Sequence, residues 1–432
     1  FGFFPSIAAG WIVSEEEFMR PVQNYINKLK LRASYGLAGN DRFYNDDGSQ
    51  KRFAYITTIG TTDGSKWGNS NAFYEKGGLR EGDPGVESLT WETVKKANGG
   101  IELGLFKMAE LQVDFFHERR EDIFMQRKNI PASAGFPSAP WANYGIVTNK
   151  GFDISLDLNK QINKDWFISA RASVTYAKNK IVEQDEDLGV LGTYRSSTGK
   201  PVGQIFDLVN DGLYTEADFE DVTTGKLKPG LPVPKFSDRV YPGDIKYVDF
   251  NGDGEITETD KTAIGGTVNP ELVYGFGINL SYKNIDFGAF FQGNGRTYRI
   301  IGENQKNFLP GSTIGAEGNI FTNASDAWTV DNPSQDVFYP RLHMGYNANN
   351  AQVSDWWLKD MSMLRLKNVE LGYSFSKNLI KKAAMEYARI FVRGTNLLQF
   401  SKFDLWDPEL NTSNGLKYPI MATYSIGLQV RF

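Results

Sequence analysis

Hydrophobic and polar residues alternate with a period of two in many segments of this chain. In 423–432 every second residue is apolar, from Tyr424 to Phe432, and small or polar residues lie between them. Successive side chains of a β-strand point to opposite faces, so this pattern predicts a strand with one apolar and one polar face. Its length matches the roughly 9–11 residues with which a tilted strand crosses a bilayer. We therefore interpret 423–432 as a membrane-spanning strand.

The same alternation predicts further strands near 3–11, 29–36, 101–105, 111–115, 152–159, 168–176, 274–282, 285–291 and 369–375. Charged residues on the second face require a wet interior, and a break in phase near Asn368 predicts a β-bulge. The count comes to about eleven strands, whereas bacterial single-chain barrels close with an even number. We expect an all-β, transmembrane antiparallel β-barrel, with this chain as the C-terminal half of a barrel of about 22 strands. The plug domain and the first strands would lie outside it.

Short and long connections alternate along the chain. Short ones are predicted near 106–110, 160–164, 283–284 and 377–387, and long ones near 38–89, 119–144, 182–271, 295–358 and 399–419. Outer-membrane barrels have short periplasmic turns and longer extracellular loops. We therefore treat 1–432 as one portion of a barrel with five long extracellular loops, located in the outer membrane of a Gram-negative bacterium.

Composition excludes several classes of protein. No apolar run approaches the roughly 18 residues of a membrane helix, and the mean hydropathy is −0.40. The chain has no cysteine and only two histidines, His117 and His343, so thiol catalysis, a zinc centre or a hydrolytic triad has little to build from. A net charge of −5 argues against nucleic acid as a partner. We expect a protein that is not an enzyme.

Seven blocks resemble the C-terminal barrel region of SusC/RagA-type, TonB-linked outer-membrane proteins. They are 4–11 (FPSIAAGW), 14–18 (SEEEF), 29–40 (LKLRASYGLAGN), 89–98 (LTWETVKKAN), 144–152 (YGIVTNKGF), 249–256 (DFNGDGEI) and 393–398 (RGTNLL). The resemblance covers essentially the whole chain. It implies active import of nutrient oligomers, oligosaccharides or peptides, through a barrel that an N-terminal plug occludes. The implied partners are TonB, acting through the absent N-terminal part, a SusD-like surface lipoprotein that caps the barrel, the remaining barrel strands and the lipid bilayer.

Two other functions remain open at this point. A SusC-like barrel that serves as a structural or assembly scaffold in a larger outer-membrane complex would show the same pattern. A secreted all-β binding protein or carbohydrate enzyme is the other alternative. Glu183 and Asp185 form an acid pair, but nothing in the sequence fixes two carboxylates at the separation that glycosidases need.

The segment 249–260 resembles a calcium-binding loop. Asp249, Asn251 and Asp253 supply oxygen donors at alternate positions, glycine follows where the loop turns sharply, and Glu255 offers its carbonyl group. Asp260 stands where such loops usually carry glutamate, and its shorter side chain favours a weaker or structural site. We predict a structural Ca²⁺ ion that rigidifies the long segment 182–271. The alternative is a solvated acidic turn.

Aromatic residues in the predicted loops are candidate substrate contacts. Trp356, Trp357, Trp67 and Tyr74 lie in polar segments, where exposed rings can stack on sugars or hold apolar peptide side chains. The competing interpretation is an aromatic girdle or packing between loops, which is common in barrels. His343 is expected to hydrogen-bond within its loop, and His117 to end a strand beside the charged residues 118–121.

Overall fold

The computed structural model describes residues 2–45, 47–69, 72–136, 138–302, 322–381 and 384–432. Nearly all regular structure in these residues is β-sheet. One α-helix is present in the described part, α1 (Lys377–Ile380). None of the helices in these ranges is both long and apolar enough to cross a membrane.

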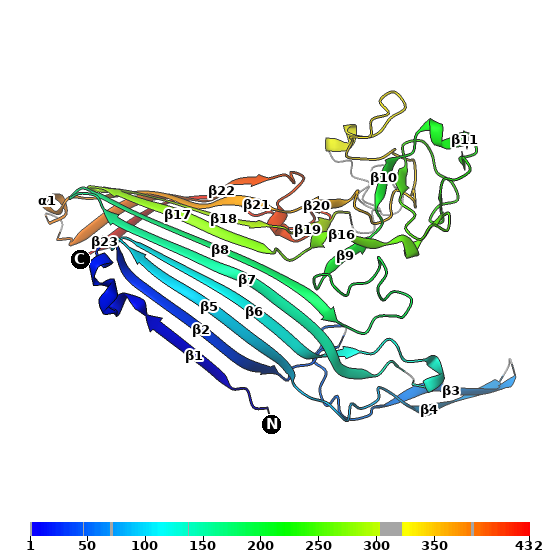
Figure 1. Cartoon of the computed structure of the whole chain (residues 1–432). Helices are drawn as coiled ribbons and strands as arrows, with labels where there is room; N and C mark the ends of the chain where they lie inside the picture. The colour runs from blue at the N-terminus through cyan, green and yellow to red at the C-terminus, as the bar shows by residue number, and fades with distance from the viewer. Residues whose placement is uncertain (1, 46, 70–71, 137, 303–321, 382–383) are drawn as a thin grey trace. The chain divides into compact units, whose positions relative to one another are not determined.

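One 11-stranded sheet dominates the chain, in the order β1-β2-β5-β6-β7-β8-β17-β18-β21-β22-β23 (Figure 1). Its strands are β1 Ser6–Ile12, β2 Ile26–Asn40, β5 Glu92–Leu105, β6 Ala109–Gln126, β7 Trp141–Gln161, β8 Trp166–Glu183, β17 Leu272–Tyr282, β18 Ile285–Gly295, β21 Met363–Ser374, β22 Tyr387–Ser401 and β23 Thr423–Arg431. Each strand of this sheet is the neighbour of the next one along the chain, whether a short turn or a long connection joins them. The predicted fold class and the predicted number of strands are confirmed.

The alternation of the sequence sets the two faces of this sheet. In β23 the side chains of Tyr424, Ile426 and Leu428 are exposed, and Ile426 keeps 73% of its surface accessible. An apolar face left uncovered over many strands is typical of a sheet whose solvent is lipid. The predicted break in phase is confirmed as a bulge, because Phe290 pairs with Asn368 and Phe291 with Leu366. Lys367 is the extra residue.

The strands are longer than the alternation predicts. β6 continues to Gln126, so the next connection is 127–140 rather than 119–144, and His117 lies within the strand instead of at its end. Charged side chains at 118–121 pair with β5: Lys96 lies 3.0 Å from Glu118 and Lys95 lies 2.5 Å from Glu121. Cross-strand ion pairs keep these residues in the sheet, although their charge suggests a loop in the sequence.

The long connections contain short strand pairs of their own. These are β3 Ile59–Asn69 with β4 Ala72–Glu81, β9 Gln204–Asp207 with β16 Thr262–Thr267, β10 Asn210–Leu213 with β14 Ile245–Tyr247, β11 Phe219–Asp221 with β12 Lys226–Leu227, β13 Val233–Pro234 with β15 Glu255–Ile256, and β19 Tyr298–Ile300 with β20 Leu358–Asp360. Three of the long connections, 41–91, 184–271 and 296–362, therefore contain strands within their described residues.

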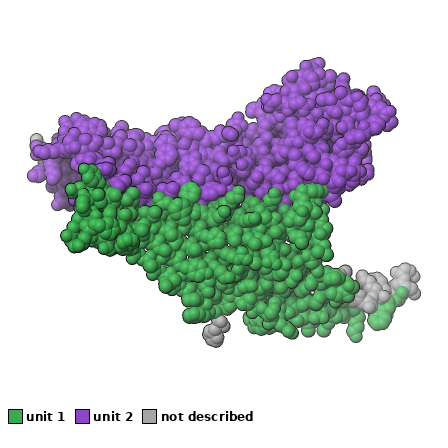
Figure 2. Space-filling model, in the orientation of Figure 1, with its two compact units in different colours: residues 1–103, 113–152, 177–202 green, residues 104–112, 153–176, 203–432 purple. Residues whose placement is uncertain are grey.

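The chain forms two compact units, coloured separately in Figure 2. Unit 1 contains 1–103, 113–152 and 177–202, and a small core around Phe43, Val86 and Phe124. Unit 2 contains 104–112, 153–176 and 203–432. Its long connections share a hydrophobic core that includes the fully buried Tyr339 and Trp357.

Candidate functional site

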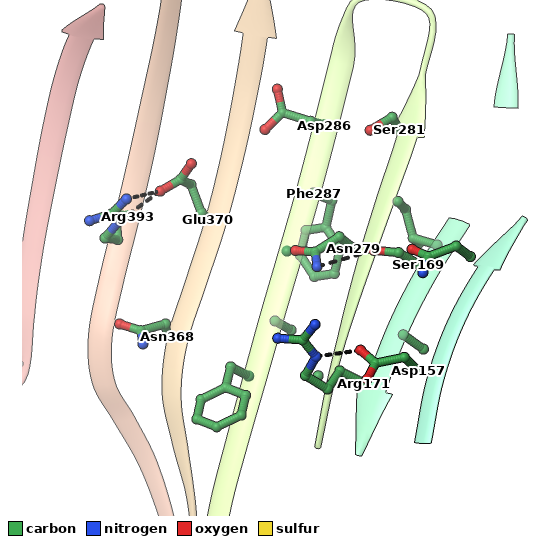
Figure 3. A pocket seen from close by; sticks show the side chains of 17 residues that line it. Asp157, Ser169, Arg171, Asn279, Ser281, Asp286, Phe287, Asn368, Glu370 and Arg393 are labelled. Atoms are coloured by element: carbon green, nitrogen blue, oxygen red, sulfur yellow. Dashed lines mark hydrogen bonds and ion pairs between the residues drawn. The ribbon is translucent and has the colours of Figure 1, made fainter. Parts of the chain in front are cut away.

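A cavity of about 820 Å³ opens on the polar face of the sheet in unit 2. Its walls come from β7, β8, β17, β18, β21 and β22 (Figure 3). The polar side chains that line it are Asp157, Asn159, Ser169, Arg171, Asn279, Ser281, Asp286, Asn368, Glu370 and Arg393. These residues alternate in sequence with the apolar residues of the opposite face, so the period of two that forms the strands also places the polar groups together.

The strand register brings these side chains within reach of one another. Asn279 of β17 is opposite Ser169 of β8, and its Nδ2 lies 3.4 Å from the Ser169 Oγ. Arg171 Nε donates to Asp157 Oδ1 at 2.5 Å. Figure 3 shows both pairs on the same wall of the cavity. Since Arg171 is 80% exposed, water screens this ion pair, which contributes little to stability.

Four charged side chains form a chain of ion pairs across β18, β21 and β22. Arg389 Nε donates to Asp286 Oδ1 at 2.9 Å, and its Nη2 lies 2.6 Å from Glu370 Oε1. Glu370 also accepts from Arg393 Nε at 2.6 Å. Arg389 is 13% exposed, so its partners replace most of its water. The two arginines and two carboxylates balance one another, and each carboxylate fixes an arginine in place.

Gly372 makes room for this chain of ion pairs. It lies on β21 opposite Phe391, and a Cβ atom at Gly372 would overlap the guanidinium group of Arg389. A side chain at position 372 would therefore require the guanidinium group of Arg389 to shift from its place between Asp286 and Glu370. Charged residues on the polar face of the predicted strands are visible in the sequence, but the pairing among them is not.

The cavity has the properties of a binding surface. It presents both signs of charge together with the amide groups of Asn279 and Asn368 and the hydroxyl groups of Ser169 and Ser281. The residues lining it include neither histidine nor cysteine. This composition suits hydrated, polar solutes that both donate and accept hydrogen bonds.

The structure gives the predicted calcium loop its own network of hydrogen bonds. Asp249 accepts from the backbone N–H groups of Gly252 at 2.6 Å and Gly254 at 2.8 Å. Asp260 is fully buried and accepts from the backbone of Phe250 at 3.0 Å and Thr257 at 2.8 Å. Asp260 thus closes the loop from inside, with both carboxylate oxygens engaged by backbone N–H groups.

The remaining predicted ligands do not form a ready acidic group. Asn251 and Asp253 accept backbone N–H bonds within the loop, and the Glu255 carboxylate pairs with Lys235 at 2.8 Å. No group of three acidic, histidine or cysteine side chains suited to a metal ion occurs in the described part of the chain. Calcium binding stays a prediction, with Asp249, Asn251, Asp253, the Glu255 carbonyl group and Asp260 as the candidate ligands.

The four aromatic candidates have different surroundings. Trp357 is fully buried and donates from Nε1 to the Asn350 carbonyl at 3.1 Å, so it has no surface to offer a substrate. Trp356 is partly buried and donates to the Phe338 carbonyl at 3.1 Å. Trp67 is 61% exposed on β3 and pairs in register with Tyr74, whose side chain lies outside the described residues.

The burial of two acidic residues was not predicted from the sequence. Asp244 is fully buried and lies 2.6 Å from the Nε2 of His343, which hydrogen-bonds within its loop as expected. Asp185 follows β8; burial opposes its charge, but bonds from Arg127 and from the Lys128 and Asn129 backbone outweigh burial and lower its pKa to about 2. Both aspartates hold loops together.

The sequence of the whole chain is similar to those of TonB-dependent receptors. It is 30% identical to TonB-dependent receptor P26 of Formosa agariphila, and 24% identical to TonB-dependent receptor SusC of Bacteroides thetaiotaomicron. Each alignment covers 100% of this chain, and 42% and 40% of those proteins respectively. The chain therefore spans less than half the length of the curated relatives it matches. No family model matches the chain.

Among solved structures, the RagAB peptide importer in its open-open state has a similar fold. The two structures superpose with a TM-score of 0.71 at 24% sequence identity. The superposition covers 99% of this chain and 42% of the importer chain. The closed-closed state of the same importer gives a TM-score of 0.69 at 24% identity. At this identity the likeness concerns the fold.

Proposed function

The chain is a homologue of the TonB-dependent receptors of the SusC/RagA type in the outer membrane, and from that premise we propose that it is part of an active importer of nutrient oligomers. The observation that carries the proposal is the amphipathic sheet. One face is exposed and apolar, and the other presents the polar cavity. A lipid-facing outer surface with a hydrated inner wall is what a transport barrel requires.

The proposal includes the partners that such a receptor needs. A plug and further strands, carried by the part of the protein beyond this chain, would complete and close the barrel. TonB would supply the energy that displaces the plug. A SusD-like lipoprotein would cover the long connections, which we assign to the extracellular side.

We propose oligosaccharides or peptides as the transported class. The cavity offers amide and hydroxyl groups from Asn279, Asn368 and Ser169, which suit the many donors and acceptors of both oligomers. Its paired charges, such as Arg171 with Asp157, add sites for charged or zwitterionic groups.

Uptake measured in the native bacterium tests this function. Labelled oligopeptides and oligosaccharides are offered to the parent strain, to a strain lacking this gene and to a strain lacking TonB. We expect uptake of at least one class to fall to background in both mutants. Restoring the gene should restore it.

The scaffold alternative predicts a different outcome. If uptake of every labelled oligomer is unchanged without the gene, while other outer-membrane complexes lose their integrity, the import proposal is wrong. The amounts of SusD-like lipoproteins on the cell surface, measured in the same strains, separate loss of a partner from loss of transport.

A further inference from the structure

A row of lysines follows the short connections of the sheet in unit 2. The hairpins β5–β6, β7–β8, β17–β18 and β21–β22 turn there, and we call 106–108, 160–165, 283–284 and 376–381 the short-turn rim. Its lysines are Lys107, Lys160, Lys164, Lys283, Lys377 and Lys381, and its one acidic residue is Asp165. The rim is strongly basic in a chain whose net charge is −5.

Backbone hydrogen bonds join the turns into a continuous edge. Asn159 N–H donates to the Met108 carbonyl at 2.7 Å, next to the first turn. Lys283 N–H donates to the Asp165 carbonyl at 2.8 Å, which links the second and third turns. Ser374 N–H donates to the Asn284 carbonyl at 2.8 Å, at the start of the fourth. The lysines are therefore held along one side of a rigid sheet.

The charge of this edge is open to a partner. All six lysines are exposed. Ion pairs in the described part of the chain engage other lysines, such as Lys261 and Lys367, and none engages Lys164, Lys283 or Lys377. Of the acidic residues that follow the rim segments, Asp286 accepts from Arg389 at 2.9 Å and Glu386 lies 3.9 Å from Arg431.

Exposed aromatic and apolar side chains border the lysines on the membrane side. The rings of Trp166 and Tyr282 lie 4.5 Å apart, and Lys283 Nζ lies 5.2 Å from the centre of the Tyr282 ring. Phe106 and Leu379 are exposed beside their own lysines. Aromatic rings at the level of the head groups, with lysine stems along them and ammonium groups reaching outward, form the pattern of a membrane interface.

We propose that the short-turn rim binds the phosphate groups of anionic phospholipids in the leaflet that the short turns meet. The occupant follows from charge complementarity, since the exposed ammonium groups of Lys164, Lys283 and Lys377, which no ion pair of the described residues engages, lie beside the exposed aromatic rings of this edge. Each lysine near an anionic lipid surface strengthens binding by about fivefold. The inference requires the membrane location and not import, so it stands or falls separately from the transport function.

Lipid retention by the full-length protein tests the proposal. The protein is purified in a neutral detergent, given phosphatidylglycerol or phosphatidylethanolamine with the same acyl chains, and bound lipid is counted by native mass spectrometry. The rim variant carries Lys164→Gln, Lys283→Gln, Lys377→Gln and Lys381→Gln. A matched control changes four exposed lysines of the long connections, Lys200→Gln, Lys228→Gln, Lys402→Gln and Lys417→Gln.

We expect the wild type and the control variant to prefer phosphatidylglycerol, and the rim variant to lose that preference by at least about tenfold. Replacing the same four rim lysines with arginine should preserve it. Equal retention by rim and control variants overturns the proposal. So does complete displacement of the lipid by inorganic phosphate, because the rim would then recognise a free anion. If the rim variant fails to fold, the four single Lys→Gln variants replace it. Each should then lower the retention of phosphatidylglycerol by about fivefold, and unchanged retention in all four overturns the proposal.

Discussion

At the scale of single residues, Gly372 leaves space for Arg389, whose partners Asp286 and Glu370 line the polar cavity. A Cβ atom there would overlap Arg389, which bridges Asp286 and Glu370. We predict that Gly372→Ala displaces the guanidinium group and destabilises the protein by about 1–3 kcal/mol, because overpacking adds to the loss of ion pairs. The measurement is the loss of β-sheet circular dichroism on heating in detergent.

Gly99→Ala is the matched control for this substitution. Gly99 also lies in a strand, β5, and nothing is within 4 Å of the place a Cβ would take. Its effect should remain within about 0.5 kcal/mol. Equal unfolding temperatures for the two variants would show that Arg389 does not depend on the space at Gly372.

Trp357 and Trp67 should respond in opposite ways to truncation. Trp357 is fully buried among Phe338 and Tyr339, so Trp357→Ala is predicted to cost about 3–5 kcal/mol of folding stability. Trp67 is 61% exposed, and Trp67→Ala should leave stability unchanged within about 0.5 kcal/mol. Thermal unfolding of both variants checks this. A stable Trp357→Ala protein would contradict the core that the structure shows.

The two tryptophans also show what a sequence leaves open at this scale. Both lie in polar segments, and local composition gives no sign that one is buried. Burial of Trp357 depends on Leu208, Ile245 and Tyr339, which come from connections far apart in the chain. Likewise, the charges of Arg389 and Glu370 are visible in the sequence, but their pairing depends on strand register.

At the scale of elements, Asp185 and Glu186 tie the end of β8 to neighbouring segments. Asp185 is 5% exposed and holds 127–129, and Glu186 holds 196–198. Burial opposes the charge of each carboxyl, but the hydrogen bonds outweigh it and lower both pKa values to about 2. Unfolded carboxyl groups have pKa values of about 3.9–4.3.

The lowered pKa values make these contacts sensitive to acid. Their stabilisation is fully present above the unfolded pKa and is lost as pH falls through the folded value, between about pH 4 and pH 2. We expect the protection of the Lys128 and Asn129 backbone against hydrogen exchange to fall in that window. Asp185→Asn should weaken the protection at neutral pH, and Asp187→Asn, on an exposed side chain, should not. Protection that is independent of pH in all three proteins would refute this role.

Calcium binding by the loop 249–260 is testable by titration calorimetry on the intact protein. If Asp249, Asn251 and Asp253 hold Ca²⁺, the wild type should release or absorb heat that is absent from the Asp249→Ala, Asp253→Ala double variant. Asp260→Asn is the informative comparison. Its side chain is fully buried against the backbone, so it should lower thermal stability even without calcium. Equal heats for the wild type and the double variant would show that the loop 249–260 does not bind calcium.

The elements themselves were the most predictable part of the fold. A strand needs only its own alternation to be recognised, so β7, β8, β17, β18 and β23 were all found from local sequence. The charged end of β6 was not, because its partners on β5 lie about 25 residues away and appear only once the strands pair. The core of the long connections lacks any period and could not be predicted at all.

At the scale of the whole molecule, the order of the sheet argues against closure within this chain. Its strands alternate in direction, so β1 and β23, the first and eleventh, run the same way. Pairing them would introduce a parallel contact, which bacterial barrels avoid by closing with an even number of strands. Each edge needs a partner in lipid, since unpaired backbone groups there are costly.

Engineered disulfides test that conclusion directly, because the chain has no cysteine of its own. Val392→Cys with Ile426→Cys joins strands that are paired in register and should form a cross-link under oxidation in the full-length protein. Ala8→Cys on β1 with Ile426→Cys on β23 should form none, because strands from the rest of the protein would separate these edges. The readout is mobility on denaturing gels without reductant. A cross-link of comparable yield between β1 and β23 would mean that the eleven strands close on themselves, and the proposed larger barrel would then be wrong.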